Sequence, residues 1–94
     1  MFAWRWDVDD SGHLAAFEVT TSKAEEELGQ ATATEFASAL DRAGVKTVTT
    51  MLRTRHQPGQ VTVLWTGEIS DPAVTRSVFQ AYERALSDAP AQLG

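Results

Sequence analysis

The sequence predicts a single α+β domain: a four-stranded, mainly antiparallel sheet with two helices packed on one face. Two observations support this fold class. Four stretches alternate apolar and polar residues as half-buried strands do, and two others repeat apolar residues at helical spacing. Their order along the 94 residues is strand, strand, helix, strand, strand, helix, and this length suits one domain.

The first two stretches form a predicted hairpin. Apolar residues recur at every second position from Phe2 to Val8 and again from Ala15 to Val19. Between them lies the segment 9–12, Asp-Asp-Ser-Gly, which consists of turn-forming residues. So short a turn predicts that the two strands pair antiparallel.

The next segment predicts a helix over residues 23–43. Ser22 and Glu25 have the spacing of an N-terminal capping box, and Gly44 fits a C-terminal cap. Gly29 lies inside the segment, where glycine costs a helix about 1 kcal/mol relative to alanine. Two interpretations stay open: one continuous helix, or a helix that breaks near Gly29 and restarts.

A second hairpin follows. The stretch 45–55 is rich in valine and threonine, which favour strands. The segment 57–60, Gln-Pro-Gly-Gln, predicts a type II turn because proline and glycine suit its two central positions. Alternation then resumes over 61–66 and predicts the fourth strand.

The second helix is predicted over residues 72–88. Asp71 is a capping residue and Pro72 takes the first helical position, where its missing N–H costs nothing. Pro90 ends any remaining helix, and we expect residues 89–94 to form a flexible tail.

The whole pattern predicts one domain over residues 1–88, built from two hairpin–helix units over 1–44 and 45–88. Each hairpin has one apolar face, and each helix has one apolar stripe, with Phe79 and Leu86 at the margin of the second stripe. The predicted core is Phe2, Trp4, Trp6, Phe17, Val19, Leu28, Phe36, Leu40, Val48, Leu52, Val61, Val63, Trp65, Val74, Val78 and Tyr82.

The composition excludes several classes of protein. The chain has no cysteine, so disulfide scaffolds, cysteine-bound metals and thiol nucleophiles are ruled out. No apolar run is long enough to cross a membrane, and the first residues do not resemble a signal peptide. We therefore expect no membrane association and a cytoplasmic location.

The net charge of −5 argues against a protein whose main task is to bind nucleic acid. The charge is uneven: residues 1–41 hold nine acidic and two basic residues, whereas residues 42–94 hold four acidic and six basic ones. This asymmetry is explained either by two complementary halves packed together or by a bipolar surface that binds a partner.

Alternation places a mixed set of side chains on the sheet face away from the helices. Arg5, Arg53 and Arg55 give this face positive charge, and Met51 and Leu64 give it apolar surface. A face of this kind predicts that a second subunit or another protein covers it. The simpler interpretation of Arg53 and Arg55 is cross-strand pairing with Asp7 or Glu18.

The candidate binding residues are Arg53, Arg55, His56, Arg5, Met51 and Leu64. The two arginines are spaced to hold a carboxylate or phosphate, so a small anionic ligand is an alternative to a protein. The two histidines lack the spacing of metal ligands, and no catalytic motif is present. We expect no metal and no cofactor.

The leading hypothesis is a small acidic protein-interaction module, a regulatory, inhibitory or accessory subunit that acts as a homodimer or with a larger protein. A second hypothesis is a ligand-binding domain whose aromatic residues line a pocket between the helices and the sheet. A third is a small enzyme whose site, with Arg53, Arg55 and His56, forms at a dimer interface.

Overall fold

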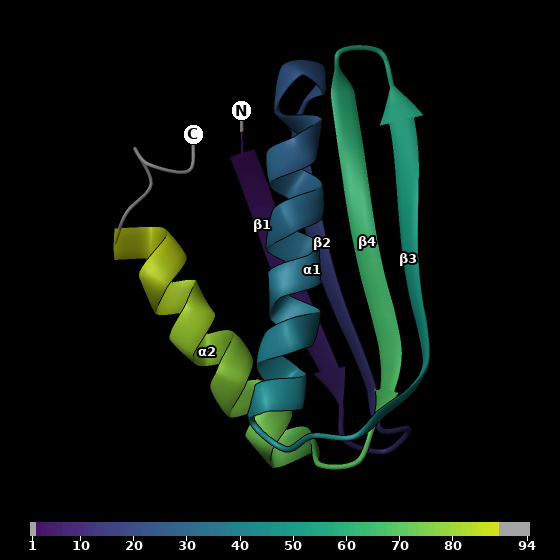
Figure 1. The fold of residues 1–94 in the computed structure, drawn as a ribbon, viewed down its shortest axis with the longest axis vertical. Coiled ribbons are helices and arrows are strands. Elements are labelled where there is room, and N and C mark those ends of the chain that lie inside the picture. The colour runs from purple at the N-terminus through teal and green to yellow at the C-terminus, as the bar shows by residue number, and fades with distance from the viewer. Residues whose placement is uncertain (1, 89–94) are drawn as a thin grey trace.

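The computed structural model describes the backbone of residues 2–88 and the side chains of residues 2–85, and it has the predicted order of elements. The tail expected at 89–94 lies outside the described residues. Figure 1 shows the elements in sequence: β1 (Phe2–Asp9), β2 (Leu14–Ser22), α1 (Glu26–Arg42), β3 (Thr47–Gln57), β4 (Gln60–Ile69) and α2 (Pro72–Asp88).

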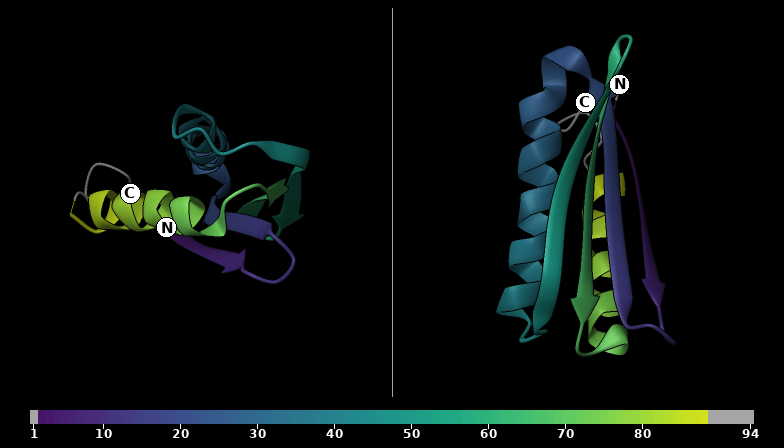
Figure 2. Two further views of the ribbon diagram at one scale, coloured as in Figure 1. Left: turned by 90° about the horizontal axis from the view of Figure 1, so that it is seen from below. Right: turned by 90° about the vertical axis from the view of Figure 1, so that its right-hand side faces the viewer.

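The four strands form one antiparallel sheet in the order β1-β2-β4-β3. Each hairpin supplies two neighbouring strands, and the pairing of β2 with β4 joins the hairpins, with Phe17 opposite Trp65. Both helices lie on the same side of the sheet (Figures 1 and 2), which confirms the predicted architecture. The order leaves β1 and β3 as the two edges.

Helix α1 is continuous through Gly29, preceded by a short 3-10 turn over Lys23–Glu25. The glycine has a packing role: a Cβ there would lie 3.2 Å from Cγ2 of Thr21, so its absence lets α1 lie close to β2. The hydroxyl of Ser22 donates to the carboxylate of Glu25 at 2.7 Å, and the serine side chain makes no cap hydrogen bond. This hydrogen bond lowers the pKa of Glu25.

The capping box predicted at the start of the first helix is not formed, since α1 begins at Glu26 and Ser22 makes no side-chain cap hydrogen bond. The predicted end of α1 and start of α2 are confirmed. Gly44 has a φ of 84°, and Val45 N–H bonds the carbonyl of Leu40 at 3.0 Å, as in a Schellman cap. At the start of α2, one carboxylate oxygen of Asp71 accepts the N–H groups of Ala73 and Val74 at 3.1 and 3.2 Å.

The core is built on stacked aromatic rings. The rings of Phe17 on β2 and Phe36 on α1 are stacked with centroids 3.6 Å apart. Phe79 on α2 lies 5.3 Å from Phe36 and 5.5 Å from Trp6. Phe79 is completely buried, so its predicted place at the margin of the helix was wrong. Val74, predicted in the core, is exposed because it lies on the outer side of α2.

Strand β3 departs most from the expected burial. Val48 is 58% exposed and Leu52 48% exposed, so their assignment to the core was wrong. A bulge between Val48 and Met51, with Thr49 at a φ of 54°, reverses the alternation and places Val48 opposite Glu68. Leu52 does face the helix side, but α1 lies over β2 and β4 (Figures 1 and 2) and meets β3 only at its margins, as where Glu26 contacts His56.

No helix in the described part of the chain is long and apolar enough to cross a membrane.

The uneven cover predicts unequal costs for two substitutions on the helix side of the sheet. Leu52→Ala should lower the free energy of unfolding by less than about 1 kcal/mol, because half of the side chain is already in water. Val63→Ala on β4, a fully buried position, should cost about 2 kcal/mol or more. Urea unfolding measures both. Equal losses would mean that β3 is covered as β4 is.

Candidate functional site

The sheet face turned away from the helices, here called the open face, carries five of the six predicted binding residues. The register aligns Arg5, Glu18, Leu64 and Arg53 in one row across the four strands. Met51 and Arg55 lie two positions along β3 on either side of Arg53 and share its face. Alternation along the strands was therefore enough to bring these residues together.

His56, the sixth predicted residue, lies on the other face. It pairs with Val61 in the register, and its Nε2 lies 3.2 Å from a carboxylate oxygen of Glu26 at the start of α1. The histidine is thus separated by the sheet from Arg53 and Arg55. A site that uses all three residues at once is not formed within one chain.

Glu18 lies within this row of the open face, and the sequence identified it as a pairing partner for Arg53 or Arg55 but not as a binding residue. Its carboxylate lies 3.3 Å from the guanidinium of Arg5, whose side chain is 80% exposed. The acidic partner expected for Arg53 or Arg55 is thus taken by Arg5. Within the described residues neither Arg53 nor Arg55 contacts a carboxylate, and Arg53 Nε instead lies 2.7 Å from the sulfur of Met51. Glu18 was recognisable as the acidic residue of the second strand on this face.

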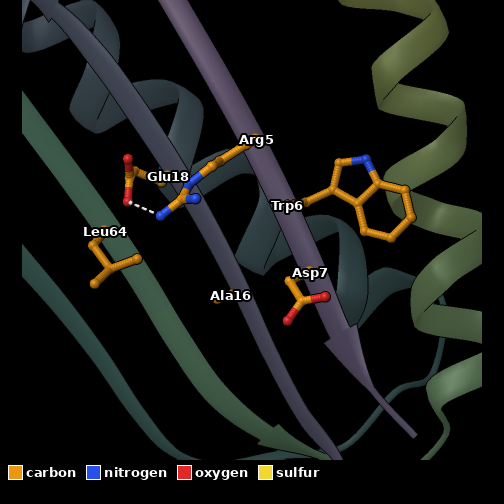
Figure 3. Close-up of a pocket in the computed structure, with 6 residues that line it drawn as sticks. All are labelled: Arg5, Trp6, Asp7, Ala16, Glu18 and Leu64. Carbon is orange, nitrogen blue, oxygen red and sulfur yellow. Dashed lines mark hydrogen bonds and ion pairs between the residues drawn. The ribbon is translucent and has the colours of Figure 1, made fainter.

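Glu18 borders three shallow hollows, one of about 100 Å³ beside Ala3 and Thr20 and two larger ones. The larger of these two, about 410 Å³, is bordered by Arg5, Asp7, Ala16 and Leu64, as Figure 3 shows. Trp6 also borders it by position, but its ring points toward α2. The smaller of the two, about 190 Å³, is lined by Glu18, Arg53, Arg55, Thr62 and Leu64. Both are open surface depressions rather than enclosed ligand pockets. The larger is bordered by the carboxylates of Asp7 and Glu18 as well as by Arg5, so only the smaller, with Arg53 and Arg55 at its rim, is suited to acidic groups of a partner.

Strand β3 carries a second exposed surface, which is continuous with the open face. Every residue from Val48 to Gly59 is exposed, so both faces of the strand are accessible to a partner. On the helix side a broad groove of about 510 Å³ lies between α1 and the start of β3, with Trp65 at its floor. Met51 and Leu52 present apolar surface on opposite faces of the same strand.

The aromatic residues that would line a ligand pocket pack on one another. The ring of Phe36 lies 4.5 Å from that of Tyr82, and Trp6 Nε1 donates to a carboxylate oxygen of Glu83 at 3.1 Å. The rings therefore fill the space between helices and sheet. In the described part of the chain, no three acidic or histidine side chains are grouped to hold a metal ion.

A polar cluster joins the two helices beside the groove. Arg42 and the hydroxyl of Tyr82 both donate to Glu35, the tyrosine at 2.9 Å. The bond from Arg42, then that from Tyr82, lowers the pKa of Glu35. Burial, followed by the hydrogen bond to Glu35, raises the pKa of Tyr82. This cluster uses Arg42 internally, so this basic side chain is less available to a partner than Arg53 or Arg55.

Known protein families, curated proteins and solved structures were compared with this chain, and none of them matches it.

The Glu35 cluster predicts a pH-dependent part of stability. A carboxyl whose pKa is lowered by folding stabilises the folded state above its ordinary pKa of 4.5, and this contribution is lost as pH falls through the lowered value. The melting temperature of the native protein should therefore exceed that of Glu35→Gln at about pH 6, and the difference should shrink below about pH 4.

Glu27→Gln is the control, since Glu27 is an exposed glutamate on the same helix. At about pH 6, Glu27→Gln should lower the melting temperature by less than Glu35→Gln does, since Glu27 takes no part in the Glu35 cluster. A Glu35→Gln difference that stays constant from about pH 6 to about pH 3 would contradict the role of this cluster.

Proposed function

We propose that this chain is a small protein-interaction module, a regulatory, inhibitory or accessory subunit that binds through β3 and the adjoining open face. Its partner is a second copy or a larger protein. The observation that carries the proposal is the exposure of β3 on both faces over almost its whole length. Fixing a long strand costs conformational entropy, and β3 buries little surface in return within the chain itself.

The apolar residues of β3 support this proposal. Val48, Met51 and Leu52 are 58%, 42% and 48% exposed. Val48 and Met51 share the open face on either side of the bulge, and Leu52 lies on the opposite face, so β3 presents apolar surface on both faces. An apolar patch bordered by arginine side chains is typical of a surface that a partner covers.

The other two hypotheses have weaker support. Ligand binding between helices and sheet is limited to the open groove beside Trp65, because the rings of Phe36, Phe79 and Tyr82 pack on one another. Enzymatic action by Arg53, Arg55 and His56 needs these side chains together, but the arginines and the histidine lie on opposite faces of β3.

The first test is native mass spectrometry of the tagged chain recovered from its own host. We expect a mass above 10.3 kDa that resolves into this chain plus a partner, or into copies of itself. Met51→Glu and Leu64→Glu place a charge on the proposed surface and should dissociate the complex. A bare chain, with or without a bound small molecule, would contradict the interaction function.

Val74→Glu is the matched control. Val74 is an exposed apolar residue on α2, away from β3, and its substitution makes the same change of charge and polarity. The complex should survive this substitution. If Val74→Glu dissociates the complex as well as Met51→Glu does, binding does not take place at the proposed surface.

A further inference from the structure

The free edge of β3 is regular only between Met51 and Gln57. On the N-terminal side of Met51, the bulge interrupts the pairing of β3 with β4. From Met51 onward, β3 pairs with β4 in one continuous register up to the pair of Gln57 and Gln60, which flank a two-residue turn. Bulges interrupt strand-to-strand pairing, so the segment 51–57 is the part of the edge open to another strand.

The turn determines which backbone groups of this edge point outward. Residues that flank a two-residue turn exchange hydrogen bonds, and hydrogen-bonded pairs then alternate with non-bonded pairs along the ladder. Counting back from Gln57, the N–H and C=O groups of Leu52, Thr54 and His56 point away from β4. An added strand would find three residues with both backbone groups available.

The charge of this edge is positive and not neutralised. The segment 51–57 contains Arg53 and Arg55 and no acidic residue. Arg53 and Arg55 project onto the open face from the segment 51–57, and in the described part of the chain neither meets a carboxylate. Glu18, the nearest acidic candidate across the sheet, bonds Arg5.

This charge pattern disfavours a second copy on the same edge. In a two-fold antiparallel pair, directly opposite side chains share a face, so the axis passes through one residue. An axis at Arg53 or Arg55 places that arginine opposite itself, and an axis at Thr54 places Arg53 opposite Arg55. Like charges directly opposite destabilise a sheet. An axis at Met51 or Leu52 avoids this but carries Arg53 or Arg55 onto the bulge at Thr49. An axis at His56 or Gln57 also avoids it, but the turn at Pro58 then leaves hardly any of the edge to pair.

We propose that the β3 edge from Met51 to Gln57 accepts an extended acidic segment of a different protein as a fifth strand. Acidic side chains at alternate positions of that segment face Arg53 and Arg55, and apolar side chains between them lie beside Leu52 on the other face. This proposal rests on the interaction function proposed above and specifies the chemistry of the partner.

The probe is a fluorescent, end-capped eight-residue peptide of alternating valine and glutamate, with the valine–lysine peptide for comparison. Fluorescence anisotropy should show binding of the glutamate peptide and weaker binding of the lysine peptide. The double charge reversal Arg53→Glu with Arg55→Glu should lower the affinity for the glutamate peptide by about tenfold or more. The lysine peptide should then bind more tightly than the glutamate peptide. Arg84→Glu, an exposed charge reversal on α2, should leave the preference unchanged.

Backbone methylation separates strand addition from simple charge attraction. A glutamate peptide with N-methyl groups at alternate residues, on the side that would face β3, keeps its charge but loses its donors and should not bind. Thr54→Pro removes one outward N–H group of the edge and should weaken binding of the unmodified peptide, while the pairing of β3 with β4 remains.

Four results would overturn the proposal. One is that the glutamate and lysine peptides bind equally well, or that neither peptide binds. Another is undiminished binding of the methylated peptide. The third is a native dimer that Thr54→Pro dissociates, since the edge would then hold a second copy. The fourth is a native complex that persists after both arginine reversals, which would contradict binding at this edge but not the proposed interaction function. A bare chain in native mass spectrometry would contradict the interaction function itself.

Discussion

The position of α1 over β2 and β4 is the constraint on which the rest of the molecule depends. Phe36 stacks on Phe17, and Gly29 allows the helix backbone to approach Thr21 where any side chain would be crowded. Trp6 and Phe79 hold α2 against β1. Because α1 lies over β2 and β4, neither helix is placed to cover β3. The exposure of β3 is a result of good packing elsewhere.

Local signals predicted the elements well, because each element carries its own chemistry. The strands show period two, Gly44 ends α1 with a positive φ, and Asp71 caps α2. The burial of β3 could not be predicted in the same way. The bulge at Thr49 has no signature in a run of valine and threonine, and Leu52 has the pattern of a core residue. Its exposure depends on where the helices lie, which a single strand does not specify.

The candidate site was predictable to the same extent. Alternation alone assigns Arg5, Arg53, Arg55 and Leu64 to one face, as the structure shows. Which arginine pairs with Glu18 depends on the strand order, and that order places β2 next to β1 but separates it from β3 by β4. The unpaired charge of Arg53 and Arg55 therefore follows from topology and not from composition.

The two halves of the chain cover each other. Helix α1, from the first half, packs on β4 of the second, and α2, from the second half, packs on β1 of the first through Phe79 and Trp6. Neither hairpin–helix unit encloses its own apolar surface, and the ladder that joins them pairs residues far apart in the sequence. Folding should therefore be all-or-none, with the closing of the β2–β4 ladder as its slow step, and neither half should be stable when the chain is cut between them.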